Sequence, residues 1–416
     1  MIFLFYLVNF IGLSYFLFKK RTFDFFSLTF FSQLIYFIPG FFGTTNYMIG
    51  RDIIEDTIVD GTYVILILFT IFLLLFTFIY DHSKFSSYGE NKIYKVNSII
   101  SEMMIAISLV TLVSIISTNG LLFFILEKKD LMEYVSSNLL LMETTASIAV
   151  VVAFLEKKKL ILLLGFGILF IDIFIGFRFA FVISLVAILF IYTNNLGKIR
   201  LVSFWKFGLF MVFLAYVVIL LKQFLYGFKF GFSDYSLQQF QTLAFYKNAL
   251  IHSEPFIIMS ILNEVVKNNF TIQLDNILVI LKMFPFMESI FSLKTPDYNQ
   301  LFQPALFPYV IYGMANSIFA QFFSMGGYLF VVWFIFLYFC ILFLGNSYLL
   351  YSKYSKSIVV LLFSMQAFYI YRNDLLYQIT LEKKYLVIFL IALLLNYLFK
   401  NVVIELSKKR VISNEK

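Results

Sequence analysis

Residues 160–192 read LILLLGFGILFIDIFIGFRFAFVISLVAILFIY, and this stretch of 33 residues decides the fold class. Only Asp172 and Arg178 are charged in it. A single helix of this length would be ~50 Å long, which exceeds the ~30 Å thickness of a hydrocarbon layer. Gly176 permits a tight reversal of the backbone just before Arg178. The stretch therefore predicts two membrane-crossing helices that meet at Gly176–Arg178.

The whole chain has the same apolar character. Of its 416 residues, 61% are hydrophobic and 13% are charged, whereas soluble proteins are about half apolar and about a quarter charged. We therefore predict an all-α polytopic membrane protein that forms a single membrane domain over residues 1–416. About 11 transmembrane helices (10–13) are expected, because many apolar runs reach the ~17 residues that a span requires. The predicted spans are residues 2–18, 23–42, 61–80, 98–118, 138–155, 160–175, 179–193, 203–221, 328–345, 357–371 and 385–400.

Lysine and arginine set the direction of the chain through the positive-inside rule. Nineteen of them fall in the connections predicted to be cytoplasmic, and seven fall in the short outer connections. This pattern places the N-terminus outside and the C-terminus inside. It also leaves residues 222–327 as one long extracytoplasmic loop, in which short amphipathic helices are predicted at 254–270 and 275–291. Topology thus explains the net charge of +8, and no nucleic-acid partner is expected.

Three of the six arginines lie where the positive-inside rule disfavours cations. Arg51, Arg178 and Arg372 all fall in short outer connections or at outer helix ends. A guanidinium group stays ionised and offers a planar fork of donors that matches a phosphate group. Each arginine could instead reach the lipid headgroups or pair with a nearby acid, and Arg51 has Asp52 beside it. If these arginines face the interior of the bundle, they form an anion-binding site on the outer face.

The long outer loop carries two candidates for acid–base chemistry in the sequence ALIHSEPFI. His252 and Glu254 could each act as a general base once the surroundings tune the side chain. The alternative is a loop histidine, with a glutamate that interacts with the dipole at a helix N-terminus. Aromatic residues are dense in LYGFKFGFSDY and QPALFPYVIYGM of the same loop. They suit sugar rings, although an aromatic belt at the membrane interface has the same composition.

Several kinds of chemistry are not expected. The sequence contains no Walker A loop and no H-E-x-x-H motif, and its lone cysteine, Cys340, lies in an apolar run. No inner connection is long enough for a nucleotide-binding domain. We therefore expect chemistry on the outer face without a nucleotide, a metal ion or another cofactor.

Four stretches together resemble the Wzy-type polysaccharide polymerases, which are the O-antigen or capsule repeat-unit polymerases of bacterial inner membranes. They are GFRFAFVISLVAILFIY (176–192), HSEPFIIMSILNEVVKNNF (252–270), SIFAQFFSMGGYLFVVWFIFLYF (317–339) and FYIYRNDLLYQI (368–379). The similarity covers the layout of the whole chain. Its most specific part is a G-x-R before one helix and an R-x-D after another, on either side of a long loop.

The resemblance implies a fold similar to that of the GT-C glycosyltransferases, in the plasma membrane of a bacterial cell, with an extracytoplasmic active site. Such an enzyme transfers the growing glycan from undecaprenyl pyrophosphate to the non-reducing end of a lipid-linked repeat unit. Arg178, Arg372 and Arg51 would bind the pyrophosphate. The resemblance aligns no general base, so Glu254 and His252 remain the candidates to deprotonate the acceptor. Expected partners are the undecaprenyl-pyrophosphate-linked oligosaccharide, membrane lipids, a chain-length regulator and a flippase.

Other functions fit parts of the same layout. An O-antigen ligase uses the same donor but delivers the polymer to a lipid A core, and the sequence separates it poorly from a polymerase. A flippase, which transports lipid-linked oligosaccharides, would be expected to have two similar halves, and the chain contains no internal repeat. A membrane scaffold without chemistry would leave the three outer arginines unexplained.

Overall fold

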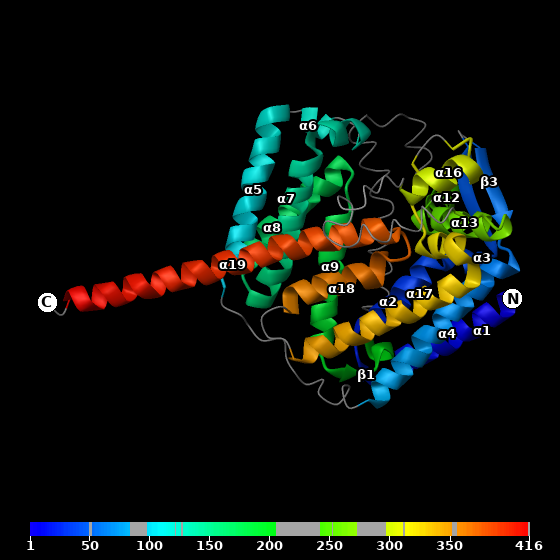
Figure 1. The fold of residues 1–416 in the computed structure, drawn as a ribbon, viewed down its shortest axis with the longest axis horizontal. Helices are drawn as coiled ribbons and strands as arrows, with labels where there is room; N and C mark the ends of the chain where they lie inside the picture. Colours follow the sequence, from blue (N-terminus) through cyan, green and yellow to red (C-terminus); the bar gives the residue numbers. More distant parts are fainter. Residues whose placement is uncertain are drawn as a thin grey trace. The chain divides into compact units, whose positions relative to one another are not determined.

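The computed structural model is mostly helical, as Figure 1 shows. Four of the described helices are long and apolar enough to cross a membrane, and several shorter apolar helices accompany them. The helical fold is confirmed and the apolar helices agree with a membrane protein, while the number of spans, their direction and the GT-C-like fold stay predictions. The predicted helix 275–291 and nearly all of the predicted span 203–221 lie outside the described residues. The structure describes residues 1–416 except 50–51, 84–97, 121, 126–127, 205–241, 252, 273–296, 311–312, 352–355 and 415–416.

The chain divides into two compact units. The first comprises Met1–Asn91, Thr193–Tyr351 and Phe363–Thr380, and the second comprises Lys92–Tyr192, Ser352–Leu362 and Leu381–Lys416. Each unit collects pieces from distant parts of the sequence, so the boundaries coincide with no change in composition. Composition alone therefore predicts one domain over residues 1–416.

In the first unit, the long apolar helix α4 packs against both α1 and α17 (Figure 1). The core beside α4 is aromatic, with the ring centroid of Phe69 lying 5.3 Å from that of Phe319 and 5.5 Å from that of Tyr371. The end of α18 (Lys356–Tyr369) and the start of α19 (Leu375–Asn414) belong to this unit. Its other elements are α1 (Ile2–Phe18), β1 (Arg21–Thr22), α2 (Phe25–Tyr36), α3 (Ile38–Phe42), β2 (Thr44–Ile49), β3 (Asp52–Thr57), α4 (Asp60–His82), β4 (Lys198–Ile199), η2 (Leu201–Phe204), α12 (Leu243–Ile251), α13 (Glu254–Lys267), α16 (Tyr298–Leu306) and α17 (Ile318–Tyr351).

The single helix predicted over residues 23–42 is in fact two helices, α2 and α3. Helix α2 begins in a capping box, in which Asp24 and Ser27 satisfy each other's backbone N–H groups. Pro39 has no N–H to donate, so it is tolerated in the first turn of α3 but not in the interior of a continuous helix. Gly43 ends α3 with a positive φ of 75°, a conformation that favours glycine.

Strands β2 and β3 form an antiparallel hairpin that the sequence analysis did not predict. Their register runs from Thr44 opposite Thr57 to Ile49 opposite Asp52. The sequence analysis treated residues 43–60 only as an outer connection. Strands β1 and β4 pair in a second two-stranded sheet. The helical chain thus carries two short sheets that an all-α prediction omits.

Helix α13 confirms the helix predicted at 254–270, but one of its polar residues is not on a solvated face. Asn263 is fully buried, and its amide nitrogen donates to the carbonyl oxygen of Thr57 at 3.0 Å. Its Oδ1 accepts from the N–H of Val59 at 2.9 Å and from the hydroxyl of Thr62 at 3.1 Å. One side chain therefore ties α13 to the end of β3 and to the start of α4.

A pair of glycines divides α17 into two limbs. Gly326 and Gly327 have non-helical backbone conformations, and the φ of Gly327 is 63°. Residues with a side chain rarely adopt that conformation, so glycine is required there. The limb after the glycines contains the predicted span 328–345, and the limb before them begins at Ile318, in the predicted loop.

The second unit is a bundle in which α5, α7 and α8 pack against one another (Figure 1). Its helices are α5 (Ile100–Asn119), α6 (Leu122–Ile125), α7 (Lys128–Glu156), α8 (Lys159–Ile175), most of α9 (Phe179–Asn195), the start of α18 and most of α19. The bounds of α8 and α9 confirm the two helices predicted from residues 160–192. Gly176 makes the reversal with a φ of 117°, and its N–H donates to the carbonyl oxygens of Asp172 and Ile173.

Candidate functional site

The turn between α18 and α19 carries Arg372, and the preceding Tyr371 anchors this turn in the core of the first unit. Tyr371 is buried, and its hydroxyl donates to the carbonyl oxygen of Thr29 at 3.0 Å. Its ring stacks on that of Tyr36, with centroids 5.2 Å apart. The N–H of Arg372 donates to the carbonyl oxygen of Tyr369 at 3.0 Å. A buried aromatic side chain thus fixes the backbone that carries Arg372.

Buried polar side chains hold the other side of the turn. Asp374 caps the start of α19, because its Oδ1 accepts from the N–H of Tyr377 at 2.7 Å. Its Oδ2 accepts from the amide of Asn316 at 2.7 Å. Gln321, on the first limb of α17, accepts from the N–H of Leu375 at 2.9 Å. The start of α19 is therefore locked to α17 and to the segment before it.

Arg372 forms an ion pair with Glu254, the first residue of α13. The pair joins Nε of the arginine to Oε1 of the carboxylate, and the guanidinium lies 5.7 Å from the ring centroid of Tyr369. Among the described residues, the two terminal nitrogens of Arg372 have no hydrogen-bond partner. The side chains of Arg372 and Glu254 are 36% and 30% exposed. Burial lowers the pKa of Arg372 and the charge of Glu254 raises it, with a net rise, so the group is permanently charged.

This arrangement is a candidate anion site. The ion pair fixes one edge of the guanidinium, and the two terminal nitrogens can bind two oxygens of one phosphate group. Three tyrosines lie close enough to Arg372 to raise its pKa, namely Tyr36, Tyr369 and Tyr377. The site is therefore aromatic as well as cationic, which suits an anion that carries an organic group.

Of the predicted site residues, the structure brings Arg372 and Glu254 together within the first unit. Arg178 belongs to the second unit, in the short connection between α8 and α9. Its side chain is partly exposed and forms no ion pair with any residue that the structure describes. Arg51 and His252 lie outside the described residues.

The pairing gives Glu254 a task other than that of the predicted general base, since its carboxylate orients Arg372. Sequence reasoning missed Asp374, Asn316 and Gln321 as parts of this site. The R-x-D spacing was an available signal for Asp374. The two amides carry no such signal, because Asn316 precedes a helix and Gln321 lies in an apolar run.

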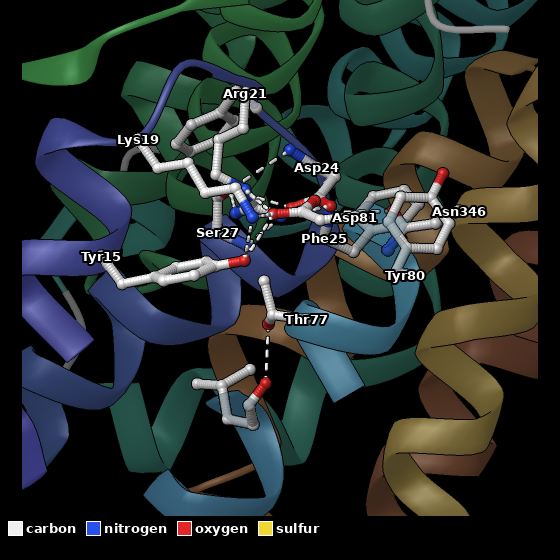
Figure 2. A network of polar contacts seen from close by, with 12 residues as sticks. Tyr15, Lys19, Arg21, Asp24, Phe25, Ser27, Thr77, Tyr80, Asp81 and Asn346 are labelled. Atoms are coloured by element: carbon white, nitrogen blue, oxygen red, sulfur yellow. Dashed lines mark hydrogen bonds and ion pairs between the residues drawn. The ribbon is translucent and has the colours of Figure 1, made fainter. Parts of the chain in front are cut away.

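A second polar cluster surrounds Arg21, in the connection between α1 and α2 (Figure 2). The side chain is 3% exposed, and its Nη2 donates to Asp24 at 2.8 Å. Its Nη1 donates to Ser27 at 2.5 Å, and its Nε donates to Asp81 at 3.2 Å. The guanidinium also lies 4.8 Å from the ring centroid of Phe16. Arg21 is one of the nineteen cations in the connections predicted to be cytoplasmic, and the structure makes it the centre of a buried ion-pair network.

Within the described part of the chain, no three side chains of His, Cys, Asp or Glu lie together in a way that could hold a metal ion. Comparisons with protein-family models, with curated proteins and with solved structures find no match for this chain. The chemistry of the Arg372 site is therefore what points to a function.

Proposed function

We propose that the chain is a glycosyltransferase that polymerises oligosaccharide repeat units in the plasma membrane of a bacterial cell. It transfers the growing glycan from undecaprenyl pyrophosphate to the non-reducing end of a lipid-linked repeat unit, on the outer face of the membrane. The observation that carries the proposal is the pairing of Arg372 with Glu254, which fixes one edge of the guanidinium and leaves the other edge for an anion. The resemblance to the Wzy-type polymerases points to the same arginine.

In this proposal Arg372 stabilises the leaving group. Negative charge develops on the bridging oxygen when the bond between the anomeric carbon of the donor and the pyrophosphate breaks. A guanidinium that is held in place beforehand needs no reorganisation, and the loss of one such contact typically costs ~3 kcal/mol. Glu254 keeps the Nε edge occupied and so orients the two terminal nitrogens. Arg178 and Arg51 are proposed as further contacts to the pyrophosphate.

Polymerisation by the purified protein tests the proposal. The full-length protein in liposomes is mixed with undecaprenyl-pyrophosphate-linked repeat units from a panel of polysaccharides, and the products are separated on a gel. The wild type should give a ladder of products with one of them. Arg372→Lys should reduce the yield by about 100-fold, because a single ammonium group does not replace a fork of donors. Arg178→Lys should have an effect in the same direction.

Arg200→Lys is the matched control, because it makes the same change at an exposed arginine of the first unit. Its ladder should equal that of the wild type. A full ladder from Arg372→Lys, or no ladder from the folded wild type across the panel, would contradict the proposal.

The same preparation separates the two alternative activities. An O-antigen ligase would attach preformed lipid-linked polymer to a lipid A core and would leave single repeat units unjoined. A flippase would move the lipid-linked unit across the vesicle bilayer without producing a ladder.

A further inference from the structure

Glycosyl transfer also needs a group that removes the proton of the acceptor hydroxyl. Glu254 is the ion-pair partner of Arg372, and His252 lies outside the described residues. A second carboxylate, that of Asp374, lies on the same turn as Arg372, two residues further along the chain. It is buried, no lysine or arginine that the structure describes pairs with it, and it lies beside buried polar atoms.

The carboxylate of Asp374 has only neutral partners in the described part of the chain. The side chain is 4% exposed, and no described lysine or arginine pairs with it. Its oxygens accept from the amide of Asn316 and from the N–H of Tyr377. A buried carboxylate usually has a cationic partner, because burial of an unpaired charge is unfavourable. A carboxylate without one, next to a candidate binding site, is a candidate for proton transfer.

Two buried polar groups adjoin Asp374. Asn316 uses its amide nitrogen on Asp374, and its Oδ1 is buried without a hydrogen-bond partner in the described structure. The hydroxyl of Tyr298, on α16, is buried near Ser324, and the charge of Asp374 raises its pKa. Buried acceptors without a donor are rare in native proteins. One hydroxyl of the acceptor sugar would supply the donor that Asn316 lacks, while a neighbouring hydroxyl of the same sugar approaches Asp374.

The charges that face Asp374 favour the uptake of a proton. Burial raises the pKa of Asp374, the N–H of Tyr377 lowers it, and the carboxylate of Asp297 next to α16 raises it, with a net rise. Tyr298, also on the α16 side, has a pKa that burial raises, so it remains a neutral hydroxyl. A carboxylate with a raised pKa is a stronger base than an ordinary one.

We propose that Asp374 is the general base of the transfer and that Asn316 positions the acceptor sugar by accepting from a neighbouring hydroxyl, an inference that rests on the proposed function. The hydroxyl oxygen attacks the anomeric carbon of the donor and forms the new glycosidic bond, while its proton passes to Asp374. The bond from the anomeric carbon to the pyrophosphate breaks, and its electron pair stays on the pyrophosphate beside Arg372. Asp374 then releases the proton to water.

Asp374→Asn separates the role of base from that of helix cap. Asparagine keeps the size, accepts from the N–H of Tyr377 and is an equally good cap, but it takes up no proton. We expect ladder formation to slow by ~10²–10⁴-fold, with the binding of undecaprenyl pyrophosphate and the midpoint of thermal unfolding unchanged. Asp374→Glu restores a carboxylate and should recover part of the rate.

A full rate in Asp374→Asn would overturn this inference and leave the proposed function intact, provided that the wild type forms a ladder and Arg372→Lys does not. The absence of a ladder from the wild type would instead remove the proposed function, and this inference with it.

The pH dependence gives a readout that a purely structural role of Asp374 would not produce. Transfer needs the charged carboxylate, so the wild-type rate should fall as the pH drops through the raised pKa of Asp374. Asp297→Asn removes a like charge from an exposed position, which lowers the pKa of Asp374. This variant should therefore move the acid limb to lower pH with the same plateau. If Asp374→Asn fails to fold, this measurement decides, because an unmoved acid limb would overturn the inference.

Discussion

Arg21 and Arg372 both belong to the first unit and use the same side chain in different ways. Arg21 has hydrogen bonds on all three nitrogens and is 3% exposed. Arg372 has a single ion pair, through Nε, and is 36% exposed.

The two arginines differ in how many N–H donors remain available to bind a ligand. A guanidinium has five N–H donors, and four of those of Arg21 are engaged by the carboxylates of Asp24 and Asp81 and by the hydroxyl of Ser27. Its charge is balanced inside the fold. Arg372 is balanced by one carboxylate and keeps accessible donors. An arginine with engaged donors holds helices together, whereas one with open donors can bind an anion.

Replacement of Arg21 should have the largest effect on stability. Arg21→Met keeps the length of the side chain but removes the cation that pairs with the buried Asp24 and one of the cations beside Asp81, which also pairs with Lys19. The loss of one partner of a buried ion pair costs ~3–5 kcal/mol. The midpoint of thermal unfolding should therefore fall sharply, as measured by size-exclusion chromatography in detergent.

Arg200→Met changes an exposed arginine and should leave that midpoint in place. Addition of Asp24→Asn to Arg21→Met removes the buried charge that has lost Arg21, keeps a good cap for α2 and should restore part of the loss. If Arg21→Met unfolds at the wild-type midpoint, the distinction between the two arginines disappears.

Arg372→Met should have a small effect on stability and a large effect on the binding of the anion. Its ion pair is partly exposed, so the free energy of unfolding should change by less than ~1 kcal/mol. Undecaprenyl pyrophosphate at 100 times its dissociation constant should stabilise the wild type by ~2.7 kcal/mol and the variant far less. Thermal unfolding with and without this lipid measures both effects. Equal stabilisation of the two proteins would show that Arg372 does not bind the anion.

The helical layout could be predicted because its causes are local in the sequence. Helix α1 has the predicted bounds, residues 2–18, since each residue of an apolar run contributes to burial in hydrocarbon. The reversal at Gly176 was predictable for the same kind of reason, because only glycine readily takes the backbone conformation that the turn requires.

The partners of the polar residues could not be predicted, because the fold brings them from distant positions. Arg21 bonds to Asp81, 60 residues away, and Asn263 bonds to Thr62, 201 residues away. Local spacing marks Glu254 as an acid at the start of a helix, but only the folded chain places Arg372 against it. The sequence therefore predicts which residue types carry the chemistry more readily than it predicts their roles.

Asn263→Ala tests how far the Arg372 site depends on polar contacts that bind no ligand. The substitution removes the partner of the buried Thr62 hydroxyl and of the part-buried N–H of Val59 and carbonyl of Thr57, and each group left unsatisfied costs ~1–3 kcal/mol. The unfolding midpoint should fall, but by less than in Arg21→Met. Ladder formation at low temperature should persist, since Asn263 touches neither Arg372 nor Asp374. A complete loss of the ladder in folded protein would instead extend the functional site to α13 as a whole.

Lys267→Ala should have the smallest effect on stability, although the N···O distances of its ion pair with Asp56 are as short as those in the Arg21 network. Lys267 lies 2.5 Å from Asp56 and 3.5 Å from Glu264, but its side chain is 45% exposed. Burial raises the pKa of Asp56, but its hydrogen bonds with Lys267 and Glu264 and the charge of Lys267 together lower it by more. The pair therefore contributes at neutral pH and is lost as the pH falls through that lowered pKa. Exposed pairs contribute ~0.2–1 kcal/mol, and salt screens them.

The unfolding midpoints of Lys267→Ala and of the wild type should therefore converge at 1 M salt, where the Debye length is ~3 Å. Lys267→Arg is the control that keeps the charge. A shift as large as that of Arg21→Met would mean that distance alone, and not burial, sets the strength of these pairs.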